Sequence, residues 1–83
     1  MGKTTFFVLN ENTFGYTFDS PDEHFVRLNV MAVDYMRGGD PLLLYNQILA
    51  PLACRRLATV QDFSHFRVSV DGYLNDDQYV FVK

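Results

Sequence analysis

Three side chains in this sequence could take part in nucleophilic or metal chemistry: Cys54, His24 and His65. Two arginines follow Cys54, and neighbouring positive charge favours the nucleophilic thiolate form of a cysteine. Nucleophilic catalysis also needs a base held against the nucleophile and a group that orients the base, and no spacing in the chain indicates either. We therefore expect Cys54 to be a small, buried apolar residue, and we expect the protein not to be an enzyme.

The histidines and carboxylates do not form a recognisable metal-binding pattern. A structural zinc site uses four ligands that usually occur in close pairs along the chain, whereas this sequence has one cysteine and two distant histidines. We expect His24 in a solvated first turn and His65 near the carboxyl end of a short helix. The acidic turn at residues 71–77 lacks the ligand order of a calcium loop. The sequence therefore predicts no metal and no cofactor.

Seven residues could contribute to a protein-binding surface. Tyrosine is enriched at the centres of interfaces, and an acidic edge is complementary to a basic partner surface, such as a nucleic-acid-binding groove. The candidates are Asp19, Asp22 and Glu23 on one edge, and Tyr73, Asp76, Asp77 and Tyr79 around one turn. The alternative for both groups is an ordinary solvated turn.

Length and composition predict a single domain over residues 1–83. Hydrophobic residues make up 48% of the chain and aromatic residues 16%, which excludes a disordered protein. A domain of this size has little interior in which to bury apolar residues. We therefore expect an exposed apolar patch that contacts a partner protein or a second copy of the chain. The formal net charge of −3 argues against nucleic acid as a partner, because nucleic-acid binders usually have a basic excess.

The cellular setting follows from cysteine content and hydropathy. A single cysteine forms no internal disulfide, which favours a reducing compartment. Residues 1–5 lack the apolar stretch of a signal peptide, and no apolar run approaches the ~20 residues needed to cross a bilayer. We therefore expect a cytoplasmic protein with no membrane partner.

Local patterns predict an α+β fold, a small single domain with an antiparallel sheet and one to three short helices. Residues 4–9 are β-branched and aromatic, and three aromatic residues alternate along 14–19, so these two segments predict a hairpin. Residues 67–71 alternate as a strand, and 78–82 return as the last strand, so a second hairpin is expected at the carboxyl end.

Three segments carry helix signals. The capping box at residues 59–62 predicts a short helix that begins there. Residues 40–52 start with Asp-Pro and place apolar residues at helical spacing, which predicts a second helix that Pro51 ends or kinks. A helix-start signal at 20–23 precedes residues 24–36, which fit a helical stripe and a strand alternation equally well. Helix and strand therefore both stay open for that segment.

Three segments resemble small uncharacterised proteins carried on plasmids, integrative elements and prophages of proteobacteria. They are Phe6 to Tyr16, Arg37 to Gly39, and Arg56 to Val68. The chain differs from that group in its leucine-rich segment 42–54 and in the expected terminal hairpin. The resemblance implies an accessory protein of a mobile genetic element. Such proteins include inhibitors of host defence, anti-CRISPR proteins among them, which would place the protein in a bacterial cytoplasm with a CRISPR–Cas subunit as its partner.

These observations predict a non-enzymatic protein-binding module, which the resemblance narrows to an anti-CRISPR-like inhibitor of a host defence complex. One alternative is a self-associating structural or accessory protein, in which a homo-oligomer covers the apolar surplus. A nucleic-acid-binding protein is the least favoured alternative because of the net charge.

Overall fold

The computed structural model describes residues 3–83, so the part of the amino-terminal expectation that concerns Met1 and Gly2 lies outside it. Within this range the strands are β1 (Thr4–Leu9), β2 (Thr13–Thr17), β3 (Phe25–Val33), β4 (Gln47–Pro51), β5 (Arg55–Leu57) and β6 (Tyr79–Val80). The α-helix is α1 (Val60–His65). The 3-10 turns are η1 (Tyr35–Arg37), η2 (Pro41–Leu43) and η3 (Leu52–Cys54).

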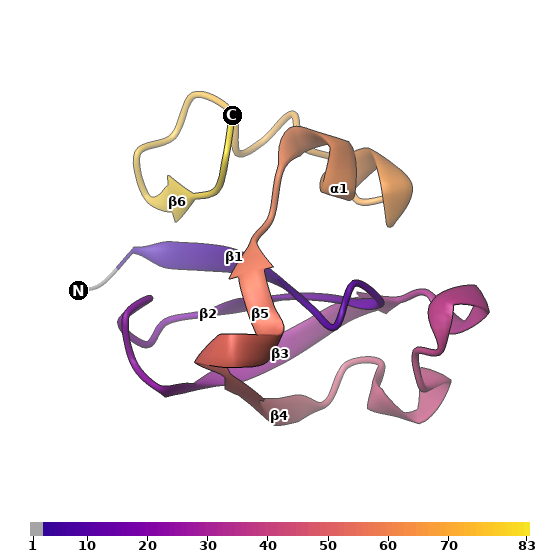
Figure 1. Ribbon diagram of the computed structural model, residues 1–83. Helices are drawn as coiled ribbons and strands as arrows, with labels where there is room; N and C mark the ends of the chain where they lie inside the picture. The colour runs from indigo at the N-terminus through magenta and orange to yellow at the C-terminus, as the bar shows by residue number, and fades with distance from the viewer. Residues whose placement is uncertain (1–2) are drawn as a thin grey trace.

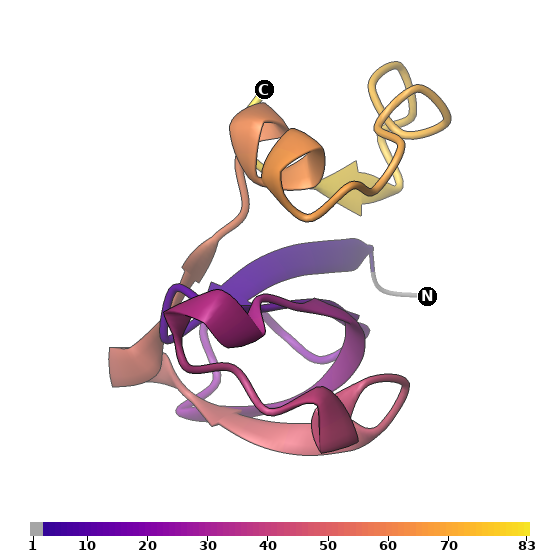
Figure 2. The same ribbon diagram turned by 90° about the vertical axis from the view of Figure 1, so that its right-hand side faces the viewer.

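The strands form one sheet that curls on itself. Its order is β4-β3-β2-β1-β5 with antiparallel neighbours, and β6 pairs in parallel with the free half of β1. Because β4 continues through the η3 turn into β5, and β5 returns to β1, the chain closes one side of the curl (Figure 2). Helix α1 and the carboxyl-terminal segment form a second layer over β1 (Figure 1).

Strand β1 supplies both cores of the molecule, because successive side chains of a strand point to opposite faces. Phe7 and Leu9 point into the curl, where they pack with Val26 and Leu28 of β3 and Ala50 of β4. This inner core packs β1 against β3 and β4 across the curl, so it stabilises the curl itself.

The outer core lies on the other face of β1, beneath α1. Phe6 of β1 is 2% exposed and contacts the rings of Phe14 from β2, Phe63 from α1 and Phe81 from the carboxyl end. The ring centroids of these pairs lie 5.0 to 6.0 Å apart. Aromatic packing around Phe6 therefore attaches the second layer to the sheet.

Several expectations from the sequence are confirmed. The first hairpin forms as β1 and β2, although β2 ends at Thr17, two residues earlier than expected. The capping box is complete: the Thr59 hydroxyl accepts from the Asp62 N–H, and the Asp62 carboxylate accepts from the Thr59 N–H. The segment left open between helix and strand is a strand, β3, preceded by a turn in which the Glu23 N–H donates to the Ser20 carbonyl.

Two expectations are wrong. Residues 40–52 form no α-helix; η2 lasts three residues, and the segment then extends as β4 alongside β3. No terminal hairpin forms either, since residues 67–71 are irregular and β6 pairs with β1. The described chain is therefore a mostly antiparallel six-stranded sheet with one short α-helix, and α+β describes it only loosely.

Candidate protein-interaction surfaces

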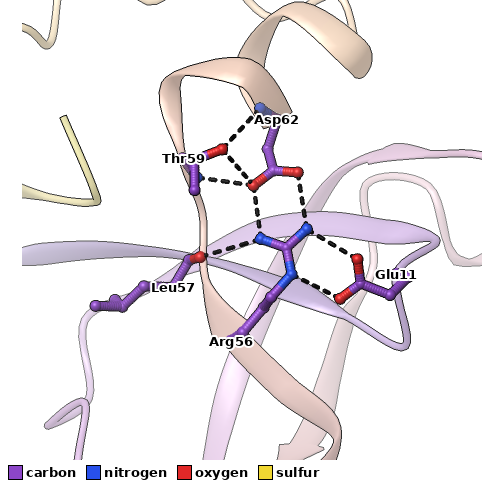
Figure 3. A network of polar contacts seen from close by, with 5 residues as sticks. All are labelled: Glu11, Arg56, Leu57, Thr59 and Asp62. Carbon is purple, nitrogen blue, oxygen red and sulfur yellow. Dashed lines mark hydrogen bonds and ion pairs between the residues drawn. The ribbon is translucent and has the colours of Figure 1, made fainter.

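A single arginine connects the second layer to the first hairpin (Figure 3). Arg56 of β5 donates from Nη1 to Asp62 Oδ2 at 2.7 Å and from Nη2 to Asp62 Oδ1 at 2.9 Å. On its other side, Arg56 Nε donates to Glu11 Oε2 at 2.6 Å. These hydrogen bonds hold the pKa of the Asp62 carboxyl at about 2 and raise the pKa of Arg56. Both carboxylates are engaged within the chain, so this network has a structural role.

This network predicts an acid-sensitive contribution to stability. The folded-state pKa of Asp62 is lowered from 3.8 to about 2, so its stabilisation is present above pH 3.8 and is lost as the pH falls through 2. We expect Asp62→Asn to lower the free energy of unfolding by about 1–2 kcal/mol at pH 6. The effect is no larger because Arg56 is partly exposed, so solvent screens the ion pair. Urea unfolding followed by circular dichroism between pH 6 and 2 should show a shallower decline for the variant. Asp71→Asn is the control, and a variant curve parallel to wild type would contradict the assignment.

A second arginine fixes the loop before β3. Arg55 of β5 is 7% exposed, its guanidinium lies over the Phe7 ring at 5.0 Å, and burial lowers its pKa. Nη1 donates to the carbonyls of Ala50 at 2.8 Å and His24 at 3.3 Å; Nη2 donates to those of Pro21, at 3.1 Å, and Glu23. The loop at residues 20–24 is thereby fixed against the junction of β4 and β5.

The three residues of the predicted acidic edge fall into two groups with different surroundings. Asp19 is bound to Arg27, with Oδ1 2.8 Å from Nη2, and Oδ2 accepts from the Arg27 backbone N–H at 2.8 Å. These hydrogen bonds hold the pKa of Asp19 at about 2. Asp22 and Glu23 lie in the Arg55-bound loop, are exposed, and form no ion pair within residues 3–83. Within the predicted acidic edge, Asp22 and Glu23 are therefore the carboxylates free to meet a partner's charge.

The four residues predicted around the turn near the carboxyl end also differ in their burial. Tyr73 and Tyr79 are half-buried, meet edge to face with ring centroids 4.6 Å apart, and both contact Phe6. Asp76 and Asp77 are exposed in the turn that joins them. The tyrosines thus belong partly to the outer core, and their remaining surface lines a hollow of about 360 Å³ together with Thr4, Phe6, Tyr16, Phe18 and Met31.

Five large apolar side chains are exposed in a segment whose spacing predicts a helix. Residues 41–54, here called the edge segment, contain no charged side chain. Leu42 is 80% exposed, Tyr45 84% and Leu49 66%, and Leu52 is also exposed. Apolar exposure on this scale in a small domain makes the edge segment a candidate interaction site. The signal was present in the sequence as fourteen consecutive uncharged residues.

Strand β4, the centre of the edge segment, forms one border of the sheet. The Leu52 N–H donates to the His24 carbonyl at 2.7 Å. Backbone groups that face a neighbouring strand recur at every second residue, so Gln47 and Leu49 direct theirs away from β3. The backbone of Pro51 likewise faces away from β3, so the N–H that proline lacks removes no hydrogen bond from the sheet. The strand thus offers unpaired backbone groups beside exposed leucines.

The chemically reactive side chains are placed as follows. Cys54 is exposed in η3, so the expected burial of this residue is wrong. The reason is that the edge segment lies on the surface. His65 ends α1, and its Nε2 lies 2.7 Å from Asp34 Oδ2. Within residues 3–83, no group of three or more His, Cys, Asp or Glu side chains is placed to hold a metal ion.

Comparison with known proteins finds no family model, no curated protein and no solved structure that matches this chain. Across the described residues, no helix is long and apolar enough to span a membrane.

Proposed function

We propose that this chain is a protein-binding module that docks its partner on the edge segment. The observation that supports the proposal most directly is the exposed, uncharged border strand β4 with Leu49 at its centre. Proteins usually protect such a border with charges, because its free backbone groups pair readily with another strand. An extended segment of the partner would add to β4 through main-chain hydrogen bonds, and the leucines would supply apolar contacts.

The charges around the edge segment define the chemistry of the partner. Asp22 and Glu23 lie beside its carboxyl end, because Arg55 fixes their loop there. Asp40 precedes its amino end, where its carboxylate accepts from the Leu42 N–H at 2.9 Å. A partner strand that is apolar at its centre and carries Lys or Arg at both ends is complementary to this arrangement.

The same charges disfavour a second copy of the chain as the occupant. Two copies related by a twofold axis would pair their β4 strands antiparallel, as an isologous contact requires. That arrangement brings Asp22 and Glu23 of one copy toward Asp40 of the other, so like charges meet at both ends of the contact. A basic partner removes this repulsion.

In this proposal the partner is a subunit of a host defence complex. Support comes from the resemblance of three segments to mobile-element proteins, which implies a CRISPR–Cas subunit. Subunits that bind nucleic acid carry basic surfaces, and such a surface has the charge that the acidic ends of the edge segment require. Docking there would inhibit the complex by occupying a working surface, with no chemical step by this chain.

The proposal is tested by affinity capture from bacterial lysates that contain active CRISPR–Cas systems, followed by binding measurements with the purified subunit. We expect one subunit to be retained at near-equal amounts by the wild type, and its binding to weaken at least tenfold with Leu49→Lys. Met36→Lys is the matched control, because Met36 is an 87% exposed apolar residue outside the edge segment. Asp22→Asn combined with Glu23→Gln should weaken binding and reduce its salt dependence.

Any of three results would overturn the proposal. One is a subunit that binds Leu49→Lys and Met36→Lys equally, and another is that no subunit is retained at all. The third result is that the purified chain forms a dimer in sedimentation equilibrium and that Leu49→Lys converts this dimer to a monomer. A second copy of the chain would then be the occupant of the edge segment.

A further inference from the structure

A hollow lined by aromatic rings lies among β1, β2, β3 and the carboxyl-terminal segment. The tyrosine pocket, defined by its lining residues Thr4, Phe6, Tyr16, Phe18, Met31, Tyr73 and Tyr79, has a volume of about 360 Å³. This volume is within the range of roughly 300–1,000 Å³ that small-ligand sites occupy. Phe18 projects into solvent with 65% of its surface exposed, which leaves one wall of the pocket accessible.

The rings are arranged as two walls over a common base. Tyr16 and Phe18 form one wall, with centroids 5.5 Å apart and planes at 73°. Tyr73 and Tyr79 form the other, with centroids 4.6 Å apart and planes at 67°. Phe6 contacts Tyr16, Tyr73 and Tyr79, at centroid distances of 6.2, 5.1 and 5.9 Å. Within residues 3–83 no ring of one wall contacts a ring of the other, so the space between them is open.

The surroundings of the pocket favour positive charge. Its lining contains no charged residue. Asp76 and Asp77 lie exposed on the turn that joins Tyr73 to Tyr79, and neither forms an ion pair in the described chain. Lys3 lines a neighbouring hollow that shares Phe18 with the pocket, so the local carboxylates outnumber it.

We propose that the tyrosine pocket binds a weakly hydrated organic cation, an alkylated ammonium or a guanidinium group. The negative faces of aromatic rings attract such cations, and several rings around one space add their effects. Weak hydration matters because the cation must leave water to enter between the walls, which a guanidinium does more readily than a simple ammonium. The hydroxyls of the half-buried tyrosines in the lining form no hydrogen bond within residues 3–83, so they remain available as acceptors for a guanidinium group. No residue of the edge segment lines the pocket, and this proposal does not depend on the function proposed for that segment.

The proposal is tested on the purified full chain by NMR, following the aromatic ring signals of Tyr73, Tyr79 and Phe18. Two pairs of probes each compare a cation with a neutral molecule of nearly the same shape. Choline chloride is compared with 3,3-dimethylbutan-1-ol, with sodium chloride holding the ionic strength constant. A short glycine-flanked arginine peptide is compared with the same peptide carrying citrulline. Tighter binding of choline than of the arginine peptide would indicate a free small cation as the natural ligand. Tighter binding of the arginine peptide would indicate a protein side chain.

We expect at least one cation to bind about tenfold more tightly than its neutral counterpart, as a desolvated cation–π contact provides. Phe18→Leu keeps an exposed apolar side chain but removes its ring, and should weaken cation binding several-fold. Phe25→Leu is the matched control, because Phe25 is 61% exposed on β3 and is not part of the pocket lining. Lys3→Gln should strengthen binding by removing a like charge.

Equal affinity for cation and neutral probe in both pairs would show a merely apolar hollow and overturn the proposal. Absence of binding by either cation at tens of millimolar would overturn it as well, as would equal affinities of Phe18→Leu and Phe25→Leu.

Discussion

Gly15→Ala will destabilise the protein by about 3 kcal/mol, the upper range for forcing extra atoms into a packed interior. A Cβ at position 15 would lie 2.5 Å from the Asn29 carbonyl oxygen and 2.9 Å from Leu28 Cγ. The first of these atoms is backbone and belongs to the paired strand β3, so it cannot move without breaking the sheet. The position also adjoins the register shift between Phe14 and Gly15, where a glycine allows two strands to approach closely.

The measurement is urea unfolding followed by circular dichroism, because the chain has no tryptophan. Gly72→Ala is the matched control: an added Cβ there meets nothing within 4 Å, and we expect a change within about 0.5 kcal/mol. Equal stabilities of the two variants would show that β2 and β3 are not in this register. The inner core of the curl would then be wrongly described.

The elements that could be predicted from the sequence are those fixed by neighbours along the chain. The first hairpin depends on alternation within residues 4–17 and on a short turn. The start of α1 depends on a reciprocal cap between two residues three positions apart. For both elements, no other secondary structure has an equally good local pattern in the sequence. The local pattern therefore determines the secondary structure that forms.

The edge segment could not be predicted in the same way, because its conformation depends on a distant partner. Its leucines have helical spacing, but β4 instead pairs along its length with β3, which begins twenty-two residues earlier. Pairing with a neighbour overrides intrinsic preference in short apolar segments. Pro51 is compatible with the end or a kink of a helix, but proline is equally compatible with a border strand.

The candidate surfaces were predictable in composition and not in arrangement. The charges of Asp19, Asp22 and Glu23 were visible in the sequence, but the pairing of Asp19 with Arg27 arises only when β2 and β3 lie together. The grouping of Tyr73 and Tyr79 was expected, whereas the opposing wall at Phe18 depends on the fold. The partner-binding role of all seven residues stays a prediction.

Arg55→Met will also cost about 3 kcal/mol, since it removes the donors from one buried carbonyl and three partly buried ones. The buried Ala50 carbonyl loses its guanidinium partner, and the loop carrying Pro21 and Glu23 loses its attachment. Methionine preserves the apolar contact with Phe7, so the loss measures the hydrogen bonds rather than a cavity. Arg27→Met is the control, because its ion pair is exposed and is worth less than about 1 kcal/mol.

The same variant connects stability to the proposed docking surface. Without Arg55 the loop at residues 20–24 is no longer fixed beside the edge segment, so Asp22 and Glu23 lose their defined place next to Leu52. Hydrogen exchange should therefore accelerate at the Leu52 amide, which donates to the His24 carbonyl of this loop. It should stay slow at the Asn29 end of the β3–β4 pair. Uniform acceleration across β3 and β4 would mean that Arg55 supports the whole sheet, and the acidic loop would then not be a separately positioned part of the docking surface.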